Sequence, residues 1–165
     1  MSDVYLLIGG NRGDRIDYLR KAVDKIKLDI GKVSRSSSVY ETEPYGFSDE
    51  CLFLNQCLFV KTSLFPLDIL RKSKQIESSM GRIRKSVKYE SRTIDIDILF
   101  YDDLIMNEIG LIIPHPEFHK RNFAMIPMSE INPGFVHPVF GRTVSNLLKK
   151  SPDMHKVVKY SDPPS

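Results

Sequence analysis

Asp95 and Asp97 are the residues of this sequence whose type and spacing best suit chemistry. They lie in the run Ile94-Asp95-Ile96-Asp97-Ile98. Side chains two residues apart share one face of a β-strand, so the run predicts isoleucines on one face and two carboxylates on the other. Two adjacent carboxylates repel each other unless a cation or water lies between them. They suit Mg²⁺, which takes one or two protein carboxylates and completes its octahedron with water and substrate phosphates. The alternative is a half-exposed strand with an acidic outer face.

A group of cationic side chains precedes this strand, within the segment 82–92. It comprises Arg82, Arg84, Lys85, Lys88 and Arg92. Arginine and lysine are the usual protein partners of phosphate oxygens. A run of positive charge is by itself more often a solvated loop. Beside the Asp pair, however, it completes the parts that a phosphoryl-transfer site needs, namely carboxylates for metal and cations for phosphate.

The elements that would position these residues follow the order βαββαβ. The sequence predicts strands over 4–8, 33–40 and 53–61, and a further strand in the octapeptide 92–99 that carries the Asp pair. We expect one helix to follow an N-cap at Asp14, and another to run from Pro66 to a C-cap at Gly81. The order is that of an α+β, ferredoxin-like fold, in which helices pack on one face of an antiparallel sheet. Residues 42–52 form a loop that could move over a ligand.

Composition narrows the possible functions. The 165 residues fit one domain, which we place at 1–160, followed by a frayed tail at 161–165. A net charge of +3 suits small anionic substrates and gives no case for nucleic acid. Two cysteines, Cys51 and Cys57, are too few for a disulfide scaffold and indicate free thiols in a reducing cytoplasm. We expect neither a signal peptide nor a membrane span.

Several motifs along the chain share the order and spacing of one family. They are the turn Gly9–Asp14, the stretch Thr42–Gly46 with Phe53-Leu54-Asn55, Arg82-x-Arg84, Arg92–Leu99, and Ile113-Pro114-His115-Pro116 with Arg121-x-Phe123. Together they resemble the 6-hydroxymethyl-7,8-dihydropterin pyrophosphokinases of folate biosynthesis. The resemblance implies transfer of the terminal diphosphate of ATP to the hydroxymethyl group of the pterin, with release of AMP. It also implies a ferredoxin-like α+β fold and a stand-alone, monomeric, cytoplasmic enzyme.

The resemblance also implies roles for individual residues. Asp95 and Asp97 would hold two Mg²⁺ ions on the ATP phosphates, with Asp97 a candidate proton acceptor, while Arg82 and Arg92 would clamp the phosphates in the transition state. The positions that match ATP contacts are Glu77, Arg84, Ile98, His115 and Arg121. Those that match pterin contacts are Thr42, Pro44, Tyr45, Phe53, Asn55, Tyr89 and Phe123.

The sequence differs from the family pattern in the segment 89–91, and two other functions remain as alternatives. Tyr89-Glu90-Ser91 stands where the family usually has Trp-Gly-Pro, which affects loop closure and product release rather than the reaction. A metal-dependent phosphodiesterase would show more metal ligands and a basic stripe. A non-catalytic, ferredoxin-like nucleotide- or RNA-binding module would expose aromatic residues on its central strands. The strand with Asp95 and Asp97, which we expect to be central, would instead repel phosphate.

Overall fold

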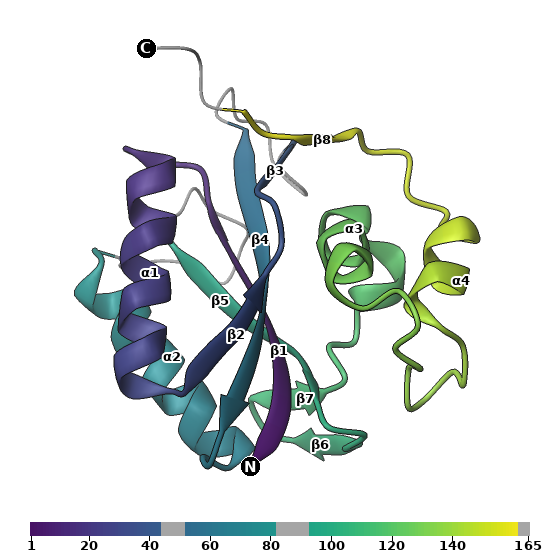
Figure 1. Cartoon of the computed structure of the whole chain (residues 1–165), viewed down its shortest axis with the longest axis horizontal. Coiled ribbons are helices and arrows are strands. Elements are labelled where there is room, and N and C mark those ends of the chain that lie inside the picture. The colour runs from purple at the N-terminus through teal and green to yellow at the C-terminus, as the bar shows by residue number, and fades with distance from the viewer. Residues whose placement is uncertain (44–51, 82–92, 162–165) are drawn as a thin grey trace.

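An antiparallel sheet runs through the middle of the molecule (Figure 1). The computed structural model describes residues 1–43, 52–81 and 93–161. Within these residues the sheet has six strands, in the order β5-β1-β4-β3-β8, with β2 also paired to β4. Their bounds are β1 Ser2–Gly10, β2 Lys32–Ser36, β3 Tyr40–Thr42, β4 Phe53–Thr62, β5 Asp95–Tyr101 and β8 Val157–Lys159. A separate hairpin joins β6 (Met106–Glu108) to β7 (Leu111–Ile113).

The helices alternate with these strands as the sequence predicts. They are α1 (Arg15–Asp29), α2 (Pro66–Ser79), α3 (Asn122–Ile131) and α4 (Val144–Lys149), with a 3-10 turn at Phe118–Lys120. From β1 to β5 the order is that of the ferredoxin-like α+β fold, so that prediction is confirmed. None of the described helices is long and apolar enough to cross a membrane.

The helix boundaries follow the predicted signals. The Asp14 carboxylate accepts a hydrogen bond from the Asp17 backbone N–H at 3.1 Å, which confirms it as the N-cap of α1. Pro66 occupies the first turn of α2, where its missing N–H leaves no unsatisfied donor. Gly81 follows the end of α2 with φ +91°, a left-handed conformation that ends the helix without a Cβ clash.

The predicted strand over 33–40 is interrupted. β2 ends at Ser36 and β3 begins at Tyr40. At the break, the Ser37 hydroxyl accepts a hydrogen bond from the Cys57 backbone N–H at 2.9 Å. A side-chain oxygen thus replaces a backbone carbonyl in the ladder, which interrupts regular pairing with β4.

Helices cover both faces of the sheet, which corrects the expectation that they would lie on one face. Figure 1 shows α1 and α2 on one side and α3 and α4 on the other. Alternate residues of β1 supply apolar side chains to both sides: Leu6 and Ile8 pack in the core beneath α1 and α2, while Tyr5 and Leu7 pack in a second core beneath α3. Because both faces of the central strand are apolar, each requires a covering layer.

The strand that carries the Asp pair lies at an edge of the sheet. The isoleucines at 94, 96 and 98 are buried, and Asp95 and Asp97 alternate with them on the half-buried opposite face, as predicted. However, β5 pairs only with β1 among the described strands, so the expectation of a central strand was wrong. Its outer edge lies beside α2, from which the buried Glu77 side chain reaches the backbone of Ile96.

Candidate active site

Four residues form a row across the sheet, one from each of four neighbouring strands. Asp95 of β5 lies opposite Gly9 of β1, Gly9 opposite Asn55 of β4, and Asn55 opposite Tyr40 of β3. Residues directly opposite in an antiparallel sheet share a face. The Tyr40 hydroxyl donates a hydrogen bond to Glu130 of α3 at 2.6 Å, so this face is the one that α3 covers. The sheet therefore places Asp95 and Asn55 on the same face.

Other site residues that were predicted from the sequence lie on the same face of the sheet. Asp97 lies opposite Leu7, which packs in the core beneath α3. Phe53 lies opposite Thr42, two residues along from Asn55 and Tyr40, respectively. The Thr42 hydroxyl is buried and has no hydrogen-bond partner among the described residues. Buried polar atoms are rarely left unsatisfied, so this hydroxyl is a candidate ligand contact.

The start of α3 contributes Arg121 and Phe123, which flank the first helical residue, Asn122. The Arg121 guanidinium carbon lies 5.6 Å from the centre of the Phe123 ring, within range of a cation–π interaction. The Arg121 side chain does not cap α3 itself. Its cation and the aromatic ring therefore occupy neighbouring positions at the helix start.

His115 is held by backbone contacts on both sides. It follows Pro114, whose peptide bond with Ile113 is cis. Its N–H donates to the Leu99 carbonyl of β5 at 3.0 Å, and its ring Nδ1 accepts from the Glu117 N–H at 3.1 Å. Because Nδ1 is an acceptor, the neutral ring carries its hydrogen on Nε2 and can donate from there.

The electrostatics of His115 connect it to two other candidates. Burial, and next the Arg121 cation, lower the pKa of His115 to about 4, although the Asp95 carboxylate acts in the opposite direction. The ring is therefore neutral at physiological pH. The fold thus brings residues 95, 115 and 121, from three separate segments, within electrostatic range of one another.

The Glu77 side chain of α2 and the backbone of Ile98 lie at the outer edge of β5. The Glu77 carboxylate accepts a hydrogen bond from the Ile96 N–H at 2.9 Å, on the side of the strand away from β1. Backbone amides two residues apart in a strand point to the same edge. The amide of Ile98 therefore faces the same edge, while its side chain is buried in the core.

Six nominated residues lie outside the described residues: Pro44, Tyr45, Arg82, Arg84, Tyr89 and Arg92. Asp153, which binds the start of α3, was not predicted from the sequence. Its carboxylate accepts from the Asn122 backbone N–H at 2.8 Å, across 31 positions of sequence. Sequence signals for a helix N-cap lie immediately before the helix, whereas Asp153 lies 31 residues after Asn122. The local sequence pattern therefore gives no signal for this contact.

The donor set at the Asp pair fits Mg²⁺. Among the described residues, no cluster of three or more potential metal-ligating side chains occurs. Two carboxylates on one face provide hard oxygen donors, which suit Mg²⁺ better than the softer metals that prefer thiolate or imidazole.

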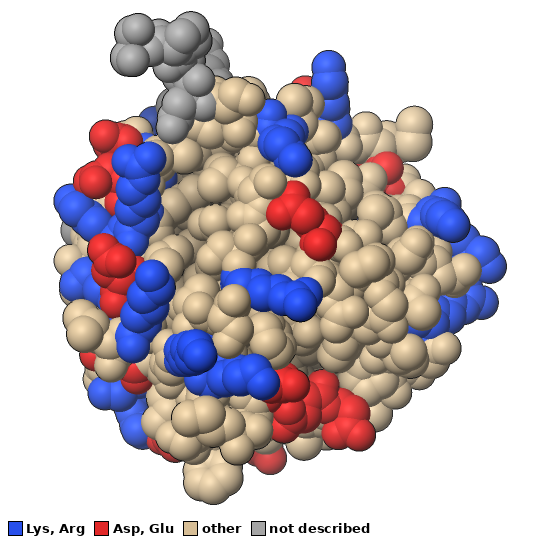
Figure 2. Space-filling view, in the orientation of Figure 1, with Lys and Arg blue, Asp and Glu red and all other residues tan. Residues whose placement is uncertain are grey.

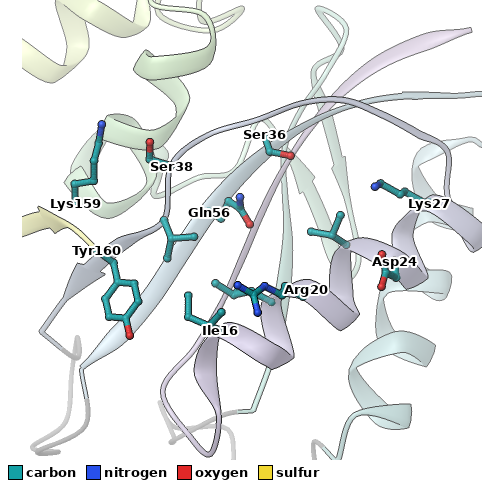
Figure 3. A pocket seen from close by; sticks show the side chains of 12 residues that line it. Ile16, Arg20, Asp24, Lys27, Ser36, Ser38, Gln56, Lys159 and Tyr160 are labelled. Atoms are coloured by element: carbon teal, nitrogen blue, oxygen red, sulfur yellow. The ribbon is translucent and has the colours of Figure 1, made fainter. Parts of the chain in front are cut away.

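A groove on the opposite face of the sheet contains none of the nominated residues (Figure 3). It has a volume of about 570 Å³ and lies between α1 and the β2–β3 region. Its lining includes Gln56, which alternates along β4 with Asn55 and so points away from it. The residues that line it are Ile16, Leu19, Arg20, Val23, Asp24, Lys27, Ser36, Ser38, Val39, Gln56, Lys159 and Tyr160.

The fold and the site together define a class of protein. Paired carboxylates face the side of an α+β sheet onto which a cation, a neutral imidazole and aromatic rings converge, an arrangement suited to phosphoryl transfer. Figure 2 shows lysine and arginine side chains interspersed with acidic ones on the face viewed, without a continuous basic stripe of the kind that binds a nucleic-acid backbone. The class is that of a small-molecule phosphotransferase.

Comparisons with known proteins specify the family. Residues 5–133 match the family model described as 7,8-dihydro-6-hydroxymethylpterin-pyrophosphokinase (HPPK). A 2-amino-4-hydroxy-6-hydroxymethyldihydropteridine pyrophosphokinase from Aquifex aeolicus (strain VF5) is 41% identical over 149 residues, covering 89% of this chain and 91% of that protein. The chain belongs to the 7,8-dihydro-6-hydroxymethylpterin-pyrophosphokinase family, and it is a transferase of folate synthesis.

Longer proteins contain a similar region. The folic acid synthesis protein fol1 of Pneumocystis carinii is 37% identical over 150 residues, which cover 91% of this chain but 20% of that protein. A crystal structure of HPPK-DHPS from Plasmodium falciparum superposes with a TM-score of 0.76 at 20% identity, covering 90% of this chain and 45% of that one. At that identity the structural match supports the fold alone.

Proposed function

We propose that the chain transfers the β,γ-diphosphate of ATP to the hydroxymethyl group of 6-hydroxymethyl-7,8-dihydropterin, at the face that carries Asp95 and Asp97. The alcohol oxygen forms a bond to the β-phosphorus, and the bond from that phosphorus to the bridging oxygen of the α-phosphate breaks. AMP leaves with the electron pair, and the alcohol proton passes to Asp97. The observation that carries the proposal is the cross-strand row that puts Asp95 and Asn55 on one face of the sheet, the face that α3 covers.

The carboxylates would hold the metal. We assign Asp95 and Asp97 as ligands of two Mg²⁺ ions, which when bound neutralise charge on the transferred phosphates. The half-buried position of both carboxylates on one face supports this assignment.

The pterin would bind between β3, β4 and α3. Asn55 can both donate and accept, which suits the amide-like edge of a pterin. The Thr42 hydroxyl, which has no hydrogen-bond partner among the described residues, lies on the same face. Phe53 and Phe123 would stack on the flat ring. We also assign Pro44, Tyr45 and Tyr89 to the pterin site, and this assignment rests only on their match to family positions.

ATP would bind along β5 and the segments that follow it. His115 and Arg121 present a neutral N–H donor and a cation to the phosphates, whereas Glu77 and the Ile98 backbone lie at the strand edge for the adenosine. Arg82 and Arg92 as phosphate clamps, and Arg84 as a phosphate contact, rest on the resemblance. We also propose that the chain acts as a monomer in the cytoplasm, which light scattering and cell fractionation would test.

A nucleotide assay tests this function. Purified protein is incubated with ATP, Mg²⁺ and the pterin, and AMP is resolved from ADP. We expect AMP only when pterin is present, and we expect its loss in the Asp95→Ala/Asp97→Ala variant. Asp103→Asn, which changes an exposed carboxylate just beyond the end of β5, is the matched control and should retain activity.

Three outcomes would contradict the proposal. Formation of ADP would mean transfer of a single phosphoryl group. Full activity in the double variant would remove the Asp pair from the reaction. Wild-type protein without pterin-dependent turnover would overturn the assigned substrate, and Tyr89-Glu90-Ser91 would then be the first segment to exchange for the usual family sequence.

A further inference from the structure

The start of α3 is capped by a residue that is distant in sequence. Arg121, at the N-cap position of α3, provides no side-chain cap. Instead, the Asp153 carboxylate accepts a hydrogen bond from the first helical N–H, that of Asn122, at 2.8 Å. A helix N-terminus has unsatisfied N–H groups and a partial positive charge, so an acidic side chain stabilises it. Asp153 therefore does for α3 what Asp14 does for α1, but from another segment.

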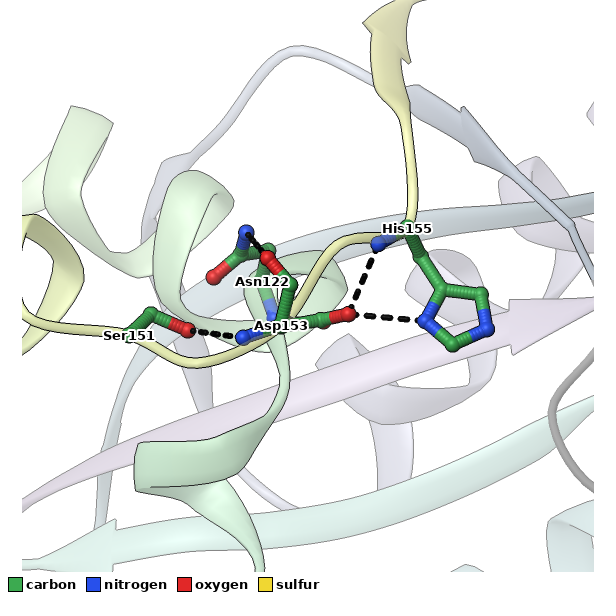
Figure 4. Close-up of polar contacts among 4 residues, drawn as sticks. All are labelled: Asn122, Ser151, Asp153 and His155. Atoms are coloured by element: carbon green, nitrogen blue, oxygen red, sulfur yellow. Dashed lines mark hydrogen bonds and ion pairs between the residues drawn. The ribbon is translucent and has the colours of Figure 1, made fainter.

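A compact network holds this carboxylate in place (Figure 4). The Asp153 side chain is only 2% exposed. Its second oxygen accepts from the His155 backbone N–H at 2.9 Å and lies 2.7 Å from the His155 ring Nδ1, which carries the hydrogen in this contact because a carboxylate can only accept. The Ser151 hydroxyl accepts from the Asp153 N–H at 3.2 Å, and the Asn122 side-chain amide donates to the Asp153 carbonyl at 3.3 Å. A buried carboxylate is tolerated only when it is satisfied in this way.

The segment that carries Asp153 joins two sides of the site. Asp153 binds the start of α3, immediately between Arg121 and Phe123. The chain then enters β8, where Val157 pairs with Thr42 of β3. One short stretch of chain therefore contacts both the helix that carries the proposed stacking ring and the strand that carries the buried Thr42 hydroxyl.

We propose that Asp153 is a positioning residue for this reaction: by holding the N-terminus of α3, it fixes the Phe123 ring against the pterin. The inference rests on the proposed pterin site. Asp153 does not touch the substrate in this scheme. Its effect passes through the backbone at Asn122, one residue before Phe123.

A double-mutant cycle between Asp153 and Phe123 tests the inference. The value of kcat/KM for the pterin is measured at saturating ATP and Mg²⁺ for wild type, Asp153→Ala, Phe123→Ala and the double variant. Because the substitution frees the backbone beside Phe123, we expect Asp153→Ala to lower kcat/KM by roughly fivefold, which corresponds to about 1 kcal/mol. In the Phe123→Ala background, the same change should cost less than about twofold, because residues that act through one contact are not additive.

Thr143→Ala is the matched control. The Thr143 hydroxyl caps α4 by accepting from the Asn146 N–H at 3.1 Å, and α4 carries none of the proposed site residues. This variant should lower the thermal midpoint to a similar degree but leave kcat/KM for the pterin unchanged. If Asp153→Ala does not fold, Asp153→Asn, which retains an acceptor for the Asn122 N–H but loses the charge, replaces it in the cycle.

The outcomes separate the inference from the function on which it rests. An equal loss from Asp153→Ala in both backgrounds, or no loss in either, would overturn the positioning role. So would a loss of kcat/KM in Thr143→Ala as large as that in Asp153→Ala. If Phe123→Ala alone leaves kcat/KM unchanged, the stacking role of Phe123 fails, and the positioning role fails with it.

Discussion

Gly9 of β1 lies directly opposite Asn55 of β4, and the side-chain oxygen of Asn55 occupies the space that a Cβ at position 9 would need. The Leu54 carbonyl would also lie 2.6 Å from such an atom. Position 9 thus lets the Asn55 amide lie across β1, in the row that ends at Asp95. A glycine is required there by close approach rather than by backbone conformation.

Replacement of Gly9 by alanine should therefore weaken pterin binding. The new methyl group must push the Asn55 amide aside or separate β1 from β4, because backbone lies behind it. We expect a loss of about 1–3 kcal/mol in unfolding free energy, as for other overpacked positions, and a rise in KM for the pterin. Gly134→Ala is the control, since a Cβ at that position meets nothing within 4 Å. An unchanged KM in Gly9→Ala would show that the position of Asn55 is not critical.

A second prediction concerns Arg15, at the start of α1. One nitrogen of its guanidinium donates to the Glu41 carboxylate at 2.7 Å and to the Leu52 carbonyl at 2.8 Å. Glu41 and Leu52 lie on either side of the segment 44–51, which includes two residues assigned to the pterin. Arg15→Gln removes the charge that holds both sides, so we expect KM for the pterin to rise several-fold with a smaller effect on kcat.

The control for Arg15 is the ion pair between Arg71 and Asp68. Arg71 of α2 lies 2.6 Å from Asp68, but both are more exposed and neither borders the site. Exposed pairs contribute roughly 0–1 kcal/mol, so Arg71→Gln should change neither KM nor stability appreciably. The prediction for Arg15 would be wrong if the two variants had the same steady-state parameters.

Local pattern predicted the parts of this fold that depend on neighbouring residues. The alternation around Asp95, the cap at Asp14 and the left-handed end of α2 at Gly81 all follow from a few consecutive residues. The edge position of β5 does not, because it depends on which strands pair across the sheet. The placement of α3 on the second face does not follow from local pattern either, because the side chains of β1 alternate between two cores that only the folded chain separates.

Contacts between residues that are far apart in the chain could not be predicted from the sequence either. Tyr40 and Glu130 are 90 residues apart, and Asn122 and Asp153 are 31 apart. Each pair is ordinary in type, since Tyr, Glu, Asn and Asp are common surface residues, and only the tertiary fold makes partners of them. The roles of the Asp pair, in contrast, were suggested by spacing and then by family motifs.

A third prediction concerns the hydrogen bond between Tyr40 and Glu130, which connects β3 to α3. The Tyr40 hydroxyl donates at 2.6 Å, and the Ser38 N–H donates to the other carboxylate oxygen at 2.5 Å. Burial and this bond to a carboxylate raise the pKa of Tyr40 to about 12. Hydrogen bonds to charged groups contribute about 1.5–3 kcal/mol, so Tyr40→Phe should lower the unfolding free energy by that order.

Tyr101 offers a matched comparison for Tyr40. Its hydroxyl donates to the neutral Leu64 carbonyl at 2.8 Å, a bond of the kind that contributes about 0.5–1.5 kcal/mol. Urea denaturation of Tyr40→Phe and Tyr101→Phe should therefore show the larger loss for Tyr40. Equal losses would mean that the charge on Glu130 adds nothing to the connection between β3 and α3.

The last prediction concerns stability at low pH and the buried His137. Its side chain is 3% exposed, its Nδ1 accepts from the backbone N–H groups of Val139 and Phe140 at 3.2 and 3.3 Å, and burial lowers its pKa to about 4. The unfolded chain therefore binds a proton near pH 6.5 that the folded chain does not bind until about pH 4, so His137 makes stability fall as pH drops through this window. The difference between pKa 6.5 and about 4, at 1.36 kcal/mol for each pKa unit, sets an upper limit of about 3.4 kcal/mol for its contribution. His137→Asn keeps an acceptor for the two N–H groups and cannot titrate. Urea denaturation at pH 7, 5.5 and 4.5 should show a shallower loss of unfolding free energy in this variant than in wild type, whatever its stability at pH 7. Parallel pH profiles would show that protonation of His137 does not drive the loss.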